Sequence, residues 1–349
     1  MAGLRFASNV QMPNVQTRRP TSILVTVASS LLAVTLAACS SDDTGGGSSG
    51  TSGSSGSSGA GSTPLGGTLC SVPDLEAAGG GFGVSRIRVS DDGSVYLLFD
   101  HAVHRYTVTA GTTCTFTKDA AFGTSGGVSA DTFDLGAPGK LVVQTFFALE
   151  VHDRVTGALT YSCDADSVGR VGVSPDGTAA YALGFTSPAK SRKYVLGAAG
   201  CTSSEAWTPS SPWSTMSTGY AQSVVVLADS VVVGAQSAVF VYGLDGAQKA
   251  VFGQSESPQD WDTFGIAYLN DIIVTSAGVD AVDTNSPNVR RYDLTGKFVR
   301  RWNITDLTGL PDTGTFGPRP DALGVAPGGE RYLAITTGDK RQIWRIPAF

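Results

Sequence analysis

The stretch that decides the fold reads Val289-Arg-Arg-Tyr-Asp-Leu-Thr-Gly296-Lys-Phe-Val-Arg-Arg-Trp302, and a related stretch runs from Val239 through Gly246 to Gly253. In each, β-branched and aromatic residues flank a short turn that ends in glycine. This pattern is typical of a β-hairpin, because glycine tolerates the positive φ that tight turns need. Equivalent glycines at positions 111, 157, 200, 246 and 296 are 46, 43, 46 and 50 residues apart.

A second kind of hairpin alternates with the first. Its clear copies turn at Gly93, Gly177 and Gly329, and looser copies turn at Gly139, at Asp229-Ser230 and at Asn270-Asp271. Two hairpins in every 40 to 50 residues predict one four-stranded propeller blade per repeat.

The number of hairpins predicts how the ring closes. The second kind occurs six times and the first kind five times, so the last blade lacks its outer strand. Residues 68–72 match the outer strand at 112–116, so we expect the N-terminal strand to lie beside the C-terminal strand. The prediction is an all-β domain over residues 68–349, a single six-bladed β-propeller with 47 residues per blade. A β-sandwich or β-helix is the alternative.

The repeats resemble those of the NHL and YVTN families of propellers, above all in Tyr292-Asp-x-x-Gly296-Lys-Phe-Val299. This resemblance implies a fold rather than an activity. Six-bladed propellers of similar type include calcium-dependent lactonases and metal-dependent lyases, which bind their ion with Glu, Asn, Asp or His near the central channel.

The N-terminus has the organisation of an export signal. Arg18 and Arg19 precede an apolar run over residues 23–36, which is short for a membrane span. Leu36-Ala37-Ala38-Cys39 resembles the lipobox of bacterial lipoproteins, so we expect residues 1–38 to be removed and Cys39 to be lipidated. Ser40 after the cysteine favours the outer membrane, with the propeller in the periplasm or at the cell surface. An ordinary cleaved signal is the alternative.

Composition separates the tether from the folded domain. Residues 39–67 are almost entirely Gly, Ser and Thr, which predicts a disordered tether. Removing residues 1–38 leaves 21 Lys and Arg against 30 Asp and Glu, a balance of −9. Since no basic run exists, nucleic acid is not an expected partner. The expected partners are the membrane, through the lipid, and a protein, peptide or glycan.

The cysteines and histidines allow several readings. An exported chain with four further cysteines predicts two disulfides, and the pairs nearest in sequence are Cys70 with Cys114 and Cys163 with Cys201. The repeat places all four near the start of an outer strand, where neighbouring blades diverge, so the connectivity stays open. His101 and His104 have metal-like spacing but fall at a turn, and His152 is expected at the surface.

Long connections between blades, at 120–130, 207–220, 254–263 and 303–320, are expected to form the ligand face. The residues expected there are aromatic and acidic: Trp207, Trp213, Trp261, Phe316, Asp260, Asp262, Asp312 and Asp321. Exposed aromatic rings beside acids suit peptide, sugar or cation binding, although the same rings would also serve to pack the loops onto the blades.

The leading hypothesis is a non-enzymatic binding or scaffold protein of the cell envelope. One alternative is a metal-dependent hydrolase or lyase that uses Asp131, Asp262 and Asp321, with Ca²⁺ as the candidate ion; no other cofactor is predicted. A third is a periplasmic assembly factor that presents apolar blade edges to other proteins.

Overall fold

The computed structural model describes residues 66–77, 83–136, 139–165, 169–184, 191–210, 220–254, 265–285, 287–311 and 317–349. The chain divides into two units, Met1–Ser57 and Ser58–Phe349, and all described residues belong to the second unit. The predicted signal peptide, Cys39 and nearly all of the predicted tether therefore lie outside the described residues.

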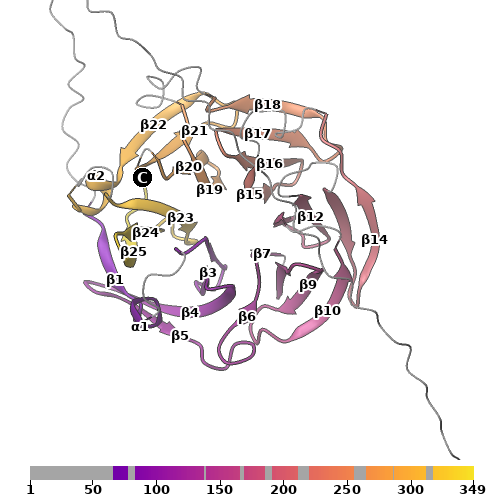
Figure 1. Cartoon of the computed structure of the whole chain (residues 1–349), viewed down its shortest axis with the longest axis horizontal. Coiled ribbons are helices and arrows are strands. Elements are labelled where there is room, and N and C mark those ends of the chain that lie inside the picture. The colour runs from indigo at the N-terminus through magenta and orange to yellow at the C-terminus, as the bar shows by residue number, and fades with distance from the viewer. Residues whose placement is uncertain are drawn as a thin grey trace, which may run out of the picture. The chain divides into compact units, whose positions relative to one another are not determined.

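The second unit is an all-β ring of sheets, as predicted (Figure 1). Four of the sheets are separate and contain four antiparallel strands each. The first has β7 (Thr132–Leu135), β8 (Lys140–Gln144), β9 (Ala148–Asp153) and β10 (Leu159–Asp164). The second has β11 (Gly169–Val173), β12 (Ala179–Gly184), β13 (Arg192–Leu196) and β14 (Cys201–Ala206). The third has β15 (Ala221–Val226), β16 (Ser230–Ala235), β17 (Ala238–Gly243) and β18 (Gln248–Phe252). The fourth has β19 (Leu269–Thr275), β20 (Gly278–Asp283), β21 (Asn288–Tyr292) and β22 (Phe298–Asn303).

The remaining strands form one nine-stranded sheet. In order it contains β2 (Arg86–Val89), β3 (Val95–Phe99), β4 (Ala102–Ala110), β5 (Cys114–Lys118), β1 (Thr68–Ser71), β25 (Lys340–Ile346), β24 (Arg331–Thr337) and β23 (Arg319–Val325), while β6 (Val128–Ser129) pairs with β4. The described residues therefore show four separate blades and one larger sheet, not the six separate blades that the repeat count predicts.

The first and last described strands of the second unit meet inside the nine-stranded sheet. Strand β1 pairs antiparallel with β25, where Cys70 lies opposite Ile343. The prediction that the N-terminal strand lies beside the C-terminal strand is confirmed. On its other side β1 pairs in parallel with β5, where Cys70 lies opposite Cys114.

Turn chemistry places most of the strands correctly. All five glycines of the first hairpin kind lie in turns before outer strands, and Gly93, Gly139, Gly177 and Gly329 lie in turns of the second kind. The turn predicted at Asn270-Asp271 is wrong, because both residues lie within β19. The turn falls instead at residues 276 and 277, just before Gly278, the first residue of β20, whose φ of 130° is one that residues with a Cβ rarely adopt.

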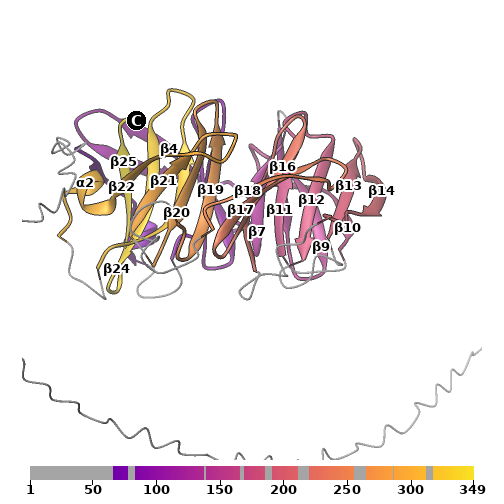
Figure 2. The same cartoon turned by 90° about the horizontal axis from the view of Figure 1, so that it is seen from above.

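The first strand of each repeat faces the middle of the ring. Strands β2, β7, β11, β15, β19 and β23 contact one another in this order around the centre (Figure 1). Viewed from the side, the strands run between two faces (Figure 2). We call the face with the β3–β4, β8–β9, β16–β17 and β24–β25 turns the loop face, because each repeat also begins and ends there.

Apolar side chains fill the space between neighbouring sheets. Val142 and Val151 of one sheet pack in a cluster with Val171 and Tyr194 of the next. Because both faces of each sheet are covered in this way, strands such as β3 and β16 are buried throughout. The two helices, α1 (Pro73–Ala77) and α2 (Ile304–Thr308), have five residues each, and no helix in the described ranges is long and apolar enough to cross a membrane.

Two disulfides connect outer strands of neighbouring repeats. Cys70 of β1 is bonded to Cys114 of β5, and Cys163 of β10 is bonded to Cys201 of β14, with Cα atoms 4.4 Å and 6.0 Å apart. These are the pairs nearest in sequence. Cys163, however, lies near the end of β10 and not near its start as the repeat predicts. That placement brings it toward Cys201 at the start of β14.

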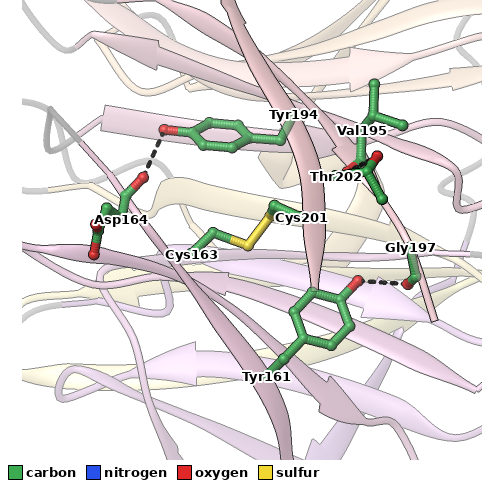
Figure 3. Close-up of a disulfide and its surroundings, with 8 residues drawn as sticks. All are labelled: Tyr161, Cys163, Asp164, Tyr194, Val195, Gly197, Cys201 and Thr202. Atoms are coloured by element: carbon green, nitrogen blue, oxygen red, sulfur yellow. Dashed lines mark hydrogen bonds between the residues drawn. A yellow bond between two sulfur atoms is a disulfide. The ribbon is translucent and has the colours of Figure 1, made fainter. Parts of the chain in front are cut away.

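Tyrosine hydroxyls support the second disulfide (Figure 3). Tyr161 on β10 donates a hydrogen bond to the carbonyl oxygen of Gly197 at 2.9 Å, and Tyr194 on β13 donates to the carbonyl oxygen of Asp164 at 3.4 Å. Both bonds cross between the same two sheets as Cys163–Cys201. The covalent link therefore joins sheets that side-chain hydrogen bonds also hold together.

Replacing Cys70 and Cys114 together by Ser is expected to lower the free energy of unfolding by about 2–4 kcal/mol, because the bond restricts the unfolded chain. The double replacement of Cys163 and Cys201 is a matched control, since the two bonds have sequence separations of 44 and 38. Amide exchange in β1 and β25 should accelerate only in the first variant, which frees the closing strand. Equal protection of β1 in both variants would contradict this role in closure.

Candidate functional site

The predicted ligand face is described only in part. Trp213, Trp261, Phe316, Asp260, Asp262 and Asp312 lie outside the described residues. Trp207 is 3% exposed, and its ring packs edge-on against Tyr181 and Tyr242. Its Nε1 donates a hydrogen bond to the carbonyl oxygen of Leu244 at 3.2 Å. Trp207 therefore packs a connection onto two sheets and does not form part of an exposed ligand surface.

Asp321 lies on the inner strand β23, near the loop face. Its Oδ2 accepts a hydrogen bond from the Thr336 hydroxyl at 2.6 Å. Burial raises the pKa of Asp321 to about 6, against the opposing effect of Thr336. A carboxyl group that titrates near neutral pH in a largely buried position is a candidate for a functional group.

The acids of the metal hypothesis have separate partners. Asp131 Oδ1 lies 3.4 Å from His101 Nδ1, whereas Asp321 is bonded to Thr336. Asp262 is outside the described residues. Within the described ranges, no three His, Cys, Asp or Glu side chains gather as a metal ion would require.

All three histidines line one groove of about 810 Å³ between β4, β6 and β9. His104 Nδ1 lies 2.8 Å from the carbonyl oxygen of Gly126. His152 is buried, contrary to the expectation that it lies at the surface, and its Nε2 lies 2.9 Å from Glu150 Oε2. Sequence analysis considered His101 with His104 and placed His152 elsewhere, whereas the structure brings all three to one groove. The contacts of His104 and His152 hold the walls of this groove together.

The same groove contains Gly123-Thr-Ser125-Gly-Gly127, which has the Gly-x-Ser-x-Gly spacing of a hydrolase nucleophile elbow. An elbow needs a strand, a sharp turn and a helix. Here the segment is a tight turn closed by hydrogen bonds between Thr124 and Gly127, and it leads into β6. No hydrogen bond from the Ser125 hydroxyl is found among the described residues, so a charge-relay arrangement is not formed.

The centre of the ring holds charged side chains that bond across it. We call Arg86, Arg88, Asp134, Ser223 and Asp271 the channel network. Arg88 Nε donates to Asp134 Oδ1 on β7 at 3.1 Å, and Arg88 Nη1 lies 3.4 Å from Asp271 Oδ2 on β19. Ser223 on β15 donates to Asp271 Oδ1 at 2.7 Å. The network therefore links four inner strands.

The carboxylates of the channel network also satisfy backbone groups. Asp134 Oδ2 accepts the N–H of Val173 at 3.0 Å, and Asp271 Oδ2 accepts the N–H of Leu323 at 3.5 Å. Burial lowers the pKa of Arg88, but Asp271 and Asp134 outweigh it, so that its pKa is raised overall. Both channel acids are thus hydrogen-bonded to Arg88 and to a backbone N–H group, and Asp271 also accepts from the Ser223 hydroxyl.

Two aromatic side chains project from the loop face at the β8–β9 turn. Phe146 and Phe147 are 61% and 76% exposed, with ring centroids 4.6 Å apart. The Phe147 carbonyl oxygen accepts the N–H of Ala165 at 3.1 Å, which places this turn beside the connection after β10. Sequence analysis missed this pair, although two phenylalanines between Thr145 and Ala148 at a hairpin position are a visible signal.

Comparisons with known proteins add no name to this geometry. No protein-family model matches the chain, and no curated protein sequence matches it significantly.

Asp271→Asn keeps the shape of the channel acid and removes its charge. We expect the free energy of unfolding to fall by about 3 kcal/mol, because Arg88 then loses one of its two buried carboxylate partners. Urea unfolding at pH 7 measures the change. Asp229→Asn removes a carboxylate that pairs with Lys249 at the surface and should behave like the wild type. Equal effects of the two replacements would exclude a special role for the channel network.

Asp321→Asn tests the raised pKa of Asp321. The folded protein binds this proton more tightly than the unfolded chain, whose Asp pKa is about 4. The stabilisation is present below about pH 4 and is lost as the pH rises through about 6. The Asn variant should therefore match the wild type near pH 4 and exceed its stability above pH 6.

Asp176→Asn is the control for this pH profile, because hydrogen bonding from Ser174 lowers the pKa of Asp176. Its stability difference from the wild type should have the opposite sign above pH 6. Urea midpoints from pH 4 to 8 measure both variants. A pH-independent difference for Asp321→Asn would show that burial does not shift this carboxyl.

Proposed function

We propose that this protein is a lipid-anchored propeller of the cell envelope that binds a protein, peptide or glycan on its loop face and does not catalyse a reaction. The observation that carries the proposal is the exposed Phe146–Phe147 pair on the loop face. Large apolar side chains that stay in water at a turn are typical of a binding surface.

We propose further that the ring has six blades of the NHL or YVTN type. The nine-stranded sheet contains two four-stranded sets, β2 to β5 and β23, β24, β25 and β1, whose described strands are hydrogen-bonded to each other only where β1 pairs with β5. Taking this parallel pair as a junction between blades gives two blades in addition to the four separate sheets.

Anchoring through Cys39 follows from the lipobox, with residues 39–67 as the tether and the outer membrane as the site. The partners of an anchored propeller must reach it near a membrane, a constraint that a free propeller does not have. A tether of Gly and Ser leaves the orientation of the loop face adjustable.

The alternative function, a metal-dependent hydrolase, lactonase or lyase, needs acids that converge on an ion. Asp134 and Asp271 are the buried acids of the channel, and each is bonded to Arg88 and to a backbone N–H. Reorganising them for a metal would break bonds that hold the inner strands. These contacts favour binding over metal-dependent catalysis.

In-cell photo-crosslinking tests the proposal. A photo-reactive phenylalanine analogue at position 147 is expected to capture a defined envelope protein or glycan, identified by mass spectrometry. The same analogue at position 155 is the control, because Val155 is 50% exposed in the β9–β10 turn at the opposite face of the same sheet. Identical adducts at both positions, or none at position 147, would contradict binding at the loop face.

The Cys39→Ser variant separates anchoring from binding. It should lose the lipid, visible in the mass of the N-terminal peptide, and leave the membrane fraction, while its purified form still captures the same molecule through position 147. Retention of the variant in the membrane fraction would contradict lipid anchoring.

A further inference from the structure

Arg86 is a buried cation whose hydrogen bonds go to neutral oxygen atoms. The residue is 3% exposed. Its Nη1 donates to the Thr132 hydroxyl at 3.3 Å, and its Nη2 donates to the carbonyl oxygen of Val224 at 2.8 Å. The carboxylate oxygen with which it forms an ion pair, Asp134 Oδ1, is 3.9 Å from Nη2. The Nε atom of Arg86 is buried and has no hydrogen-bond partner among the described residues.

The nearby carboxylates have closer donors than Arg86. Asp134 Oδ1 accepts from Arg88 at 3.1 Å, and its Oδ2 accepts from the N–H of Val173. Asp271 is bonded to Arg88, to the Ser223 hydroxyl and to the N–H of Leu323. Because these carboxylates lie closer to Arg88, they neutralise the charge of Arg88 more than that of Arg86.

Arg88 competes with Arg86 for the channel carboxylates. It extends from the same strand as Arg86, two residues further on, and its Nη2 atom is also buried without a partner. Burial, with a further contribution from the neighbouring Arg88, lowers the pKa of Arg86 to about 9 against the opposing effect of Asp134. Because a guanidinium group keeps its proton at neutral pH, the charge on Arg86 persists. A buried charge with no close counter-charge is costly.

We infer that the central channel binds one small monovalent oxyanion, a carboxylate group, between Arg86 and Arg88. Unpartnered guanidinium N–H groups are the donors that carboxylate oxygens accept best. A water molecule would accept a hydrogen bond from Arg86 Nε but would leave its charge uncompensated. This site is separate from the loop-face surface and does not depend on what binds there.

Formate is the probe for this site. The full mature chain in detergent is titrated with sodium formate, at an ionic strength held constant by a bulky sulfonate salt, while the midpoint of thermal unfolding is followed. The expected result is a saturable rise in the midpoint, together with one binding site in a calorimetric titration. A flat response to every anion tested would overturn the proposal and leave water as the partner of Arg86.

Larger anions show whether the carboxylate group belongs to a free small ion or to a larger ligand. A response that weakens from formate to acetate to succinate indicates a free small ion, whereas a response that persists to succinate indicates the carboxylate end of a larger ligand entering the channel. Either result supports a carboxylate site. Phe147→Ala, which alters the loop face, should leave the formate response unchanged and so separates this proposal from the proposed function.

Thr132→Asp and Thr132→Asn form a matched pair, because Thr132 is buried and its hydroxyl already contacts Arg86. The Asp variant supplies an internal carboxylate, so it should unfold at a higher temperature without formate and lose the formate response. The Asn variant has the same shape without the charge and should keep the response. An Asp variant that responds like the Asn variant would overturn the proposal.

Arg86→Gln provides a second variant should Thr132→Asp not fold. It removes the charge to be compensated, and formate affinity should fall at least tenfold. Undiminished affinity in this variant would overturn the assignment to Arg86.

Discussion

The inner strand of each sheet has one edge without a neighbouring strand, and backbone N–H and C=O groups along that edge need partners when they are buried. In this protein charged side chains serve as those partners. Asp134 accepts the N–H of Val173, and Arg86 donates to the carbonyl oxygen of Val224. Because each of these bonds connects two different sheets, the contacts that satisfy the backbone also fix the position of the sheets around the centre. The charges are buried in the process, and the pairing of Arg88 with two carboxylates offsets part of the cost of this burial.

Closure of the ring depends on a strand from the opposite end of the chain. Strand β1 completes the hydrogen bonding of β25, and it also pairs with β5, so that one strand joins the last repeat to the first. Contacts between chain ends are expensive in loop-closure entropy, and a terminal strand frays easily. The Cys70–Cys114 bond lies within this pairing, where it holds β1 to the first repeat. A protein exported to an oxidising compartment is able to form such a bond, which is consistent with the export signal predicted from the sequence.

The bonds across the centre also bear on function. Side chains of β2 reach β15 and β19, so the channel network occupies the middle of the ring at this level. A large partner therefore meets the faces of the ring and not its interior. The loop face has the exposed Phe146–Phe147 pair, whereas the interior has guanidinium groups suited to one small anion. The proposed recognition of a macromolecule at the face and the proposed binding of an anion in the channel thus concern separate parts of one ring.

The sequence by itself determined the ring of sheets and its closing strand, since turns and strand patterns are local properties of the chain. The signals were hairpin glycines such as Gly93 and Gly296 and the match between residues 68–72 and 112–116. The turn predicted at Asn270-Asp271 is wrong because the chain turns just before Gly278, which has a positive φ, while Asp271 lies within β19 and bonds to Arg88, 183 residues away. The repeat pattern indicated that Trp207 lies at a connection but not that Tyr181 and Tyr242 bury it. Only the tertiary structure decided the channel network and the groove of the three histidines. Both depend on which side chains of distant strands face one another, and that is fixed by the packing of whole sheets and not by any local pattern.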